Sequence, residues 1–222
     1  MEIYDKNKLY TFIPTNFSIN DIKKMSLIQS NDIYEKHNAT AKISGELICC
    51  NNYDNIIKET YTNYEETLKL RDLSKDKWIY NIIDGYDEQD KIIFQDELFI
   101  LIPTYTWNLI DLKKFHLLAI IKDKNLRSIR DLRNEHIDLL NHIKKISLPI
   151  IETKYNINSN KIKMYFHYLP STYQLHIHFA DINNKNVNSS VEYSHELNIV
   201  IYNLSLYSEY YKKINLLIYK TH

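Results

Sequence analysis

Three histidines, His167, His176 and His178, lie within the thirteen residues HYLPSTYQLHIHF at positions 167–179, and the loop between them carries Ser171. Imidazole nitrogens can ligate a metal, attack phosphorus or bind phosphate oxygens, so neighbouring residues must decide among these chemistries. Three histidines with an open fourth position would suit zinc. A nucleophilic histidine beside imidazole and hydroxyl donors would instead suit chemistry on a phosphate ester.

Alternation in this stretch predicts two antiparallel strands, KIKMYFHYLP and QLHIHFA, joined by the short loop LPSTY. Apolar side chains share one face of the pair and polar side chains share the other. The polar set is Lys163, Tyr165, His167, Gln174, His176 and His178, with Ser171 in the loop. Surface histidines on a half-exposed hairpin, a zinc site and a phosphate site all stay open at this point.

The composition limits how phosphate can be bound. Gly45 and Gly85 are the only glycines among 222 residues, which excludes glycine-rich phosphate loops of the GxGxxG or P-loop type. The formal net charge is +0, from 28 basic and 28 acidic residues, and this balance argues against binding of duplex nucleic acid. Any phosphate site must therefore be built from side chains.

The adjacent cysteines Cys49 and Cys50 cannot join distant parts of the chain, and free thiols indicate a reducing compartment. The N-terminal residues have no basic flank followed by an apolar core, so no signal peptide is expected. Apolar runs such as LLAII at 117–121 are too short to span a bilayer. These features predict a cytoplasmic protein, with the nucleus as a second location, and no membrane partner.

In the N-terminal part, KLYTFI at 8–13 and KISGELICC at 42–50 have the pattern of strands. A short helix is predicted after Ser18 through IKKMSLI, and another is predicted to begin at Asp54 and run through IIKETY. The following charged residues show no alternation and are interpreted as a hinge or connecting helix. The predicted divisions are 1–58 for an N-terminal domain, 59–77 for the hinge and 78–222 for a C-terminal domain.

The C-terminal part begins at KWIYNII and contains strand patterns in KIIFQ, ELFILIP and FHLLAIIK. A helix is predicted from Asp131, with apolar residues at helical spacing, and Pro149 is expected to kink or end it. The last apolar segment, VEYSHELNIVIYNLSLY, is interpreted as helical. The chain shows no internal repeat and no low-complexity linker.

The segment QLHIHFA resembles the histidine-triad signature, in which histidines alternate with apolar residues. The longer stretch HYLPSTYQLHIHF resembles the scavenger mRNA-decapping enzymes within that superfamily. The similarity extends in the same order to SNDIY (30–34), WIYNI (78–82), LIPTYTWN (101–108) and LRSIRDL (126–132). It implies an α+β fold, with a C-terminal histidine-triad domain behind a small N-terminal α+β domain that is domain-swapped in a homodimer.

The resemblance also implies an activity. In that family the central histidine attacks the phosphate next to 7-methylguanosine without a metal or other cofactor, and water then hydrolyses the histidine–nucleotide intermediate. The products are 7-methyl-GMP and a nucleoside diphosphate, from a methylated cap dinucleotide or a short capped oligoribonucleotide left by 3′-to-5′ mRNA decay. His176 matches the nucleophile, and His167, Ser171 and His178 match the residues that bind the phosphate chain.

The methylated base of a cap is flat and positively charged. An aromatic face attracts such a ring, and a carboxylate accepts hydrogen bonds from the guanine N1 and N2 groups. By resemblance, Trp78 stacks on the base and Glu88 accepts from its edge, while Lys58 binds phosphate. The resemblance also assigns cap contacts to Asn31 and Tyr34 of the N-terminal domain and to the segment Pro103, Thr104, Tyr105 and Thr106.

This chain departs from the family pattern at several site positions. Gln174 replaces the first triad histidine, where its amide is expected to donate a supporting hydrogen bond. Thr104 and Thr106 replace an acid and a lysine, and Tyr105 replaces an aliphatic residue and can form a sandwich with Trp78. Two alternatives to decapping therefore stay open. They are a catalytically weak cap-binding regulator and a hydrolase of other dinucleoside polyphosphates.

A structural role, in a turn and a helix cap, is expected for three residues of LRSIRDL. These are Arg127, Arg130 and Asp131.

Overall fold

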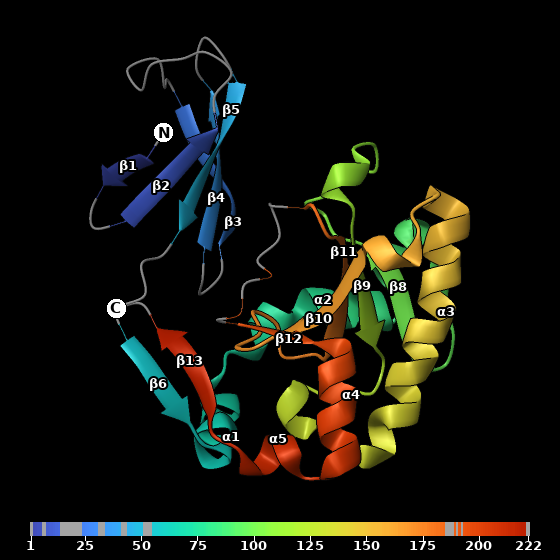
Figure 1. The fold of residues 1–222 in the computed structure, drawn as a ribbon. Coiled ribbons are helices and arrows are strands. Elements are labelled where there is room, and N and C mark those ends of the chain that lie inside the picture. Colours follow the sequence, from blue (N-terminus) through green and yellow to red (C-terminus); the bar gives the residue numbers. More distant parts are fainter. Residues whose placement is uncertain are drawn as a thin grey trace. The chain divides into compact units, whose positions relative to one another are not determined.

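The computed structural model describes residues 2–5, 8–13, 24–30, 34–40, 44–50, 55–184, 189, 191 and 193–220, and only the backbone of those up to residue 50. The chain forms two compact units (Figure 1). One comprises Met1–Ile57 with Tyr219–His222, and the other comprises Lys58–Ile218. Helices and antiparallel sheets together give an α+β fold, as the sequence predicted.

The N-terminal unit contains a five-stranded antiparallel sheet with the strand order β1-β2-β5-β4-β3. The predicted strands at 8–13 and 42–50 are confirmed as β2 and β5. The predicted helix through IKKMSLI is wrong where it reaches residues 24–30, because strand β3 pairs there with β4. Ser18 lies outside the described residues. The strands are β1 Glu2–Asp5, β2 Lys8–Ile13, β3 Lys24–Ser30, β4 Tyr34–Thr40 and β5 Ser44–Cys50.

The second unit contains a six-stranded sheet with the order β12-β10-β11-β9-β8-β7, in which every paired strand is antiparallel. The predicted strands of this part are confirmed, including the pairing of the two histidine-bearing strands β10 and β11, although KIIFQ is a strand only at Phe94–Gln95. The last apolar segment is helical only from Leu197, because residues 194–196 form strand β12. The strands are β7 Phe94–Gln95, β8 Phe99–Pro103, β9 His116–Ile121, β10 Ile162–His167, β11 His176–Asp181 and β12 Ser194–Glu196.

Five α-helices and several 3-10 helices are described in the same unit. The α-helices are α1 Tyr61–Leu70, α2 Lys77–Ile83, α3 Ile137–Tyr155, α4 Leu197–Leu206 and α5 Tyr210–Lys213. The 3-10 helices are η2 Leu73–Asp76, η3 Gln89–Lys91, η4 Leu112–Lys114, η5 Ile129–Asp131, η6 Asn134–His136 and η7 Ser159–Lys161. Strand β6, Asn55–Glu59, pairs with β13, Leu216–Lys220, in a separate two-stranded sheet. No helix of the described ranges has the length and apolar character to cross a membrane.

The helix predicted from Asp54 is wrong, because residues 55–59 form strand β6. The helix begins at Tyr61 instead, where Thr60 and Asn63 cap it reciprocally. The expected hinge, 59–77, contains this helix and lies within the second compact unit from residue 58 onward. Its Tyr64 is fully buried and donates a hydrogen bond to Asp131 over 2.6 Å.

The long helix α3 begins later and ends later than the sequence indicated. Ser128 and Asp131 cap the 3-10 turn η5 reciprocally, so the residues after Asp131 enter turns before the α-helix begins at Ile137. Pro149 does not end the helix, which continues to Tyr155. Asn156 ends it with a left-handed φ of 54°, a conformation that asparagine tolerates.

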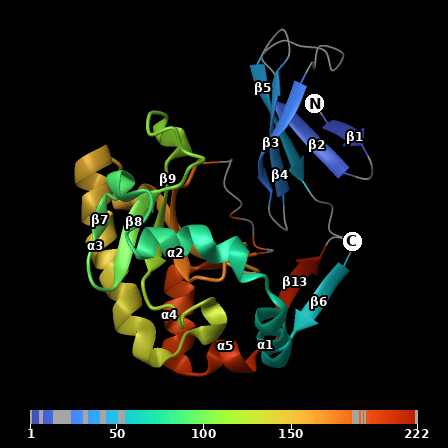
Figure 2. The same cartoon turned by 180° about the vertical axis from the view of Figure 1, so that it is seen from behind.

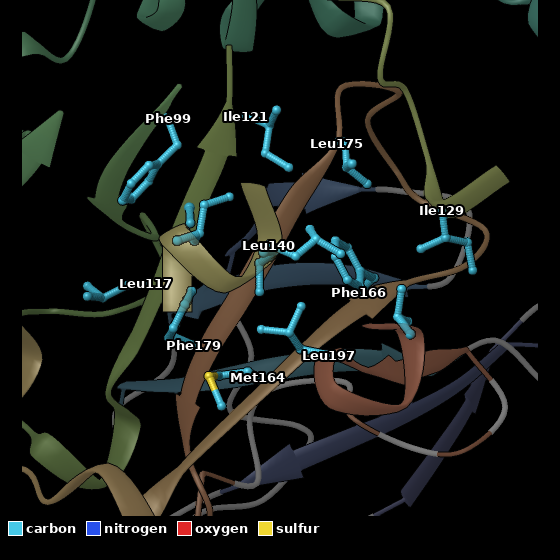
Figure 3. Packing of buried hydrophobic residues seen from close by; sticks show 14 of the residues in the cluster. Phe99, Leu117, Ile121, Ile129, Leu140, Met164, Phe166, Leu175, Phe179 and Leu197 are labelled. Carbon is cyan, nitrogen blue, oxygen red and sulfur yellow. The ribbon is translucent and has the colours of Figure 1, made fainter. Parts of the chain in front are cut away.

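Helices cover both faces of the six-stranded sheet (Figures 1 and 2). Leu140 of α3 and Leu197 of α4 belong to the large apolar core, which they share with Phe166 and Phe179 of the sheet (Figure 3). On the other face, helix α2 contributes a smaller apolar cluster. This cluster consists of Ile79, Ile82, Ile100, Ile102 and Ile120.

The fully buried Arg130 joins several segments of the second unit. Its guanidinium donates to the side chain of Glu59 over 3.0 Å and to the backbone carbonyl oxygen of Glu59 over 2.7 Å. It also donates to the carbonyl oxygens of Tyr211 and Ile214 over 2.9 and 2.7 Å. Tyr168, next to His167, donates its hydroxyl to the same Glu59 carboxylate. The structural role expected for Arg130 is therefore confirmed.

Replacement of Arg130 by Met should lower the free energy of unfolding by about 3–5 kcal/mol, because it leaves the buried Glu59 carboxylate without its counter-ion. Arg127→Met, at an exposed position of the same turn, should change it by less than about 0.5 kcal/mol. Urea titrations of both variants measure the difference. Equal stabilities would contradict the importance of the buried pair.

Candidate active site

The histidines lie on the sheet face that also carries α2. Strand register places His176 opposite Ile120 and His178 opposite Leu118, so these four side chains share one face. Because Ile120 packs in the cluster beneath α2, that helix covers the sheet next to the histidines. Strand β10 pairs with the other edge of β11, and there Tyr165 lies opposite His178, as the alternation predicted.

Three predicted histidines form a compact group. The ring of His178 lies 4.2 Å from that of His167 and 5.0 Å from that of His176, measured between centroids. Tyr165 stacks on His178 with a centroid distance of 5.0 Å and an interplanar angle of 7°. His176 and His178 are buried and His167 is half-buried, so the interpretation as surface histidines fails for two of the three.

The backbone fixes the tautomer of His176. Its Nδ1 lies 2.7 Å from the carbonyl oxygen of Gln174 and must donate to it, since a carbonyl oxygen only accepts. Burial lowers the pKa of His176, although the bond to this carbonyl and the negative charge of Asp76 oppose the shift. The neutral ring therefore carries its proton on Nδ1 and has a free electron pair on Nε2, as a nucleophile requires.

The amide of Gln174 donates hydrogen bonds, as expected, but to the main chain rather than to His176. Its acceptors are the carbonyl oxygens of Ile121 and Asp123, at 2.6 and 2.9 Å. The support for His176 comes from the main chain of residue 174, which any amino acid supplies. The replacement of a triad histidine by Gln174 therefore preserves the tautomer of His176.

His116 joins the group, although the sequence analysis treated it only as part of a buried strand. Its Nε2 lies 2.9 Å from His178 Nδ1, and the two rings stack with centroids 5.1 Å apart. Burial lowers the pKa of His116 to about 3. Alternation within β9 could have identified it, because His116 shares the face of Leu118, which pairs with His178.

The loop that carries Ser171 is held by residues of the predicted hinge. Arg71 donates to the backbone oxygen of Ser171 over 2.7 Å and lies over the ring of Tyr173 at 4.5 Å. Asp76, buried, accepts two hydrogen bonds from Arg71 and one from the backbone N–H of Tyr173. Sequence analysis missed both Arg71 and Asp76, because a charge in a polar stretch is usually solvated.

Trp78 lies near the start of helix α2, and Glu88 lies beyond its end. Trp78 is 42% exposed, while Ile79 and Ile82 of the same helix face the sheet. Glu88 follows the helix in a left-handed conformation with a φ of 52°, and its carboxylate accepts a hydrogen bond from Lys91 over 3.0 Å. Glu88 is thus ion-paired at a half-buried position.

The segment after β8 forms a tight turn beside His116. Thr104 donates its backbone N–H to the carbonyl oxygen of His116 over 3.1 Å, and the hydroxyls of Thr104 and Thr106 share a hydrogen bond of 2.9 Å. Pro103 ends the strand, and Tyr105 is 61% exposed in the turn. The two threonines therefore bond to each other where the family pattern has two opposite charges.

The remaining predicted residues are less fully described. Asn31 lies outside the described residues, and Tyr34 is described only by its backbone at the start of β4. Lys58 is exposed in β6. Within the described ranges, no group of three or more His, Cys, Asp or Glu side chains has a metal-binding arrangement.

Comparison with known proteins shows which family the chain belongs to. The family described as "Scavenger mRNA decapping enzyme C-term binding" matches residues 77–193, more than half of the chain. The chain belongs to this family. A solved structure, "Hnt3 in complex with DNA and guanosine", aligns with a TM-score of 0.43 and 19% identity over 59% of this chain and 77% of that one. A likeness of this degree supports no statement about the chain.

Curated relatives in the decapping family are called "m7GpppX diphosphatase". Those of Rattus norvegicus and Homo sapiens are each 36% identical over 166 residues, which is 71% of this chain and 49% of each relative. That of Ascaris suum is 32% identical over 223 aligned positions, which cover 95% of this chain and 69% of the relative. The chain spans about half the length of the two mammalian relatives.

Mutation can separate the role of the Gln174 side chain, which bonds to β9 and the residues after it, from that of its main-chain carbonyl, which bonds to His176. Gln174→Ala should lower the free energy of unfolding by about 1–3 kcal/mol, because the buried carbonyl oxygen of Ile121 and the half-buried one of Asp123 lose their donor. The proton of His176 should stay on Nδ1, since the carbonyl of residue 174 remains. Urea titration measures the first effect, and ¹⁵N NMR of histidine-labelled protein measures the second. Movement of the proton to Nε2 in the folded variant would contradict the main-chain account.

Proposed function

We propose that this chain hydrolyses the 5′–5′ triphosphate of a methylated cap dinucleotide or short capped oligoribonucleotide. The observation that carries the proposal is the buried His176, whose Nδ1–H bond to Gln174 leaves Nε2 free to attack phosphorus. Its place in the decapping family gives the substrate class. The products are 7-methyl-GMP and a nucleoside diphosphate.

In the first step, His176 Nε2 forms a bond to the phosphorus next to 7-methylguanosine, and the bond to the bridging oxygen breaks. The nucleoside diphosphate leaves with that oxygen. The phosphorylated ring keeps its Nδ1 proton and is positively charged, so the carbonyl of Gln174 and the negative charge of Asp76 stabilise it. Water then attacks phosphorus and restores His176.

The phosphate chain needs donors beside this nucleophile. His167 and His178 provide ring nitrogens within the group, and Ser171 lies in the loop that Arg71 anchors. Lys58 is proposed to add a positive charge. Since the chain has no glycine-rich loop, these side chains carry the phosphate binding.

For the base, we propose a sandwich between Trp78 and Tyr105, because both are exposed aromatics. Trp78 lies on the helix that packs on the histidine face of the sheet, and Tyr105 lies in the turn beside His116. Glu88 accepts from the guanine edge after it exchanges its bond with Lys91. Pro103 and the bonded pair Thr104 and Thr106 shape the wall of the pocket. We also propose that the chain forms a homodimer.

A second candidate is the hydrolysis of other dinucleoside polyphosphates. It is favoured by one observation, the mutual hydrogen bond of Thr104 and Thr106 where the family pattern has an acid and a lysine. A pocket wall without these charges gives less discrimination among bases. The same nucleophile serves both reactions, so base preference separates them.

His176→Asn should lower turnover of a cap dinucleotide at least about 10³-fold while cap affinity changes little, because the nucleophile acts mainly in the transition state. Product analysis by chromatography and equilibrium titration measure the two quantities. In the parent protein, a chelator should leave turnover unchanged. Activity that disappears with chelator and returns with zinc would support the three-histidine zinc site instead.

Trp78→Ala and Tyr105→Ala should each weaken binding of methylated cap about tenfold, since each removes one face of the sandwich. Unmethylated cap, which lacks the positive charge, should be affected less. Tyr202→Ala on α4 is the matched control, because Tyr202 is 59% exposed and α4 covers the opposite face of the sheet.

Titrations with methylated and unmethylated cap decide between the aromatic sandwich, cap recognition without it, and the alternative substrates. An unchanged methyl preference in Tyr105→Ala would rule out the sandwich. An unchanged preference in Trp78→Ala as well would rule out cap recognition, and would favour the hydrolysis of other dinucleoside polyphosphates.

A further inference from the structure

The contact between His116 and His178 has a consequence for the chemistry of His178. Both side chains are buried, and His116 Nε2 lies 2.9 Å from His178 Nδ1. Burial lowers the pKa of both residues, so both rings are neutral and each carries one proton. One proton therefore lies between the two rings, and its donor decides which nitrogen of His178 carries a proton.

Two arrangements are possible. If His116 Nε2–H donates, His178 accepts at Nδ1 and carries its own proton on Nε2. If His178 Nδ1–H donates, its Nε2 is bare and His116 carries a proton on Nδ1. Among the described residues, neither His116 Nδ1 nor His178 Nε2 has a hydrogen-bond partner.

In the protein alone the two arrangements are balanced, because each leaves one buried N–H without a partner, on His178 Nε2 in the first and on His116 Nδ1 in the second. A bound anion removes this balance. His178 belongs to the histidine group, next to His167 and His176, so in the first arrangement its Nε2–H can donate to an anion bound there. In the second arrangement the bare Nε2 turns an electron pair toward a phosphate oxygen.

We propose that His116 is a positioning residue: when phosphate binds, His116 donates its Nε2–H to His178 Nδ1, so that His178 carries its own proton on Nε2 and donates it to a phosphate oxygen of the substrate. This inference rests on the function proposed above for its phosphate ligand, and pyrophosphate tests it without cap cleavage. His116 itself is held by main-chain pairing of β9 with β11 and by the bond from Thr104 N–H to its carbonyl oxygen.

Two substitutions separate donation from packing. His116→Phe keeps a ring beside His178 but removes the donor, so the proton of His178 is no longer fixed and both tautomers become populated. His116→Gln keeps an N–H donor on a side chain long enough to reach, and should keep the Nε2–H tautomer. Leu118→Met is the matched control, because Leu118 pairs with His178 and makes no polar contact through its side chain.

The first measurement is ¹⁵N NMR of histidine-labelled protein, which reports the protonated nitrogen of His178 directly. With pyrophosphate bound, the proton should be on Nε2 in the parent protein, in His116→Gln and in Leu118→Met. In His116→Phe at the same pyrophosphate concentration, part of His178 should keep its proton on Nδ1. A proton on Nδ1 of His178 in the pyrophosphate-bound parent protein would overturn the proposal, and this test needs no variant to fold.

The second measurement is a titration with inorganic pyrophosphate. His116→Phe should weaken its binding about tenfold, the effect of losing a hydrogen bond to a charged group, and His116→Gln should bind within about threefold of the parent. Equal affinity in folded His116→Phe and the parent would overturn the proposed donor. If the tautomer and the pyrophosphate result are as expected but no cap is cleaved, the role of His116 stands and the proposed function fails.

Discussion

A neutral imidazole has one proton and two nitrogens, and at His176 the carbonyl oxygen of Gln174 decides where that proton lies. The chemistry proposed for the site follows from this bond, because it leaves Nε2 as the free nucleophile. The bond joins residues two apart in the chain, so it needs only the local conformation at the start of β11. The rest of the fold has to hold that start in place.

Three sets of contacts hold the start of β11 in place. The amide of Gln174 donates to two carbonyl oxygens at the end of β9. Asp76 accepts from the backbone of Tyr173 and is itself held by Arg71. Farther along, Arg130 and Glu59 fix Tyr168, where the loop leaves β10. Buried polar groups therefore surround the loop on both sides, and each costs stability if its partner is lost.

The sequence predicted those parts of the site that depend on alternation within one strand. It placed His167, His176 and His178 on one face and found the pairing of β10 with β11, because side-chain period and a short loop are local properties. It missed His116, since its partner comes from a strand 62 residues away. It also made Asn55–Glu59 a helix, because a helical start at Asp54 says nothing of β13, whose pairing makes this segment a strand. Arg71 and Asp76 were missed for the same reason, as burial of a charge depends on distant residues.

The proposed base-binding half of the site differs from the proposed phosphate half. At the phosphate half, fixed and buried hydrogen bonds orient neutral rings. At the base half, Trp78 and Tyr105 are exposed, Glu88 is held by a surface lysine, and the two threonines bond to each other. A cationic base bound there would gain most of its binding energy from aromatic faces, because the one carboxylate has to exchange an existing ion pair to reach it. In the proposed function, the chemistry is thus preset by the fold, whereas substrate choice depends on a few exposed side chains.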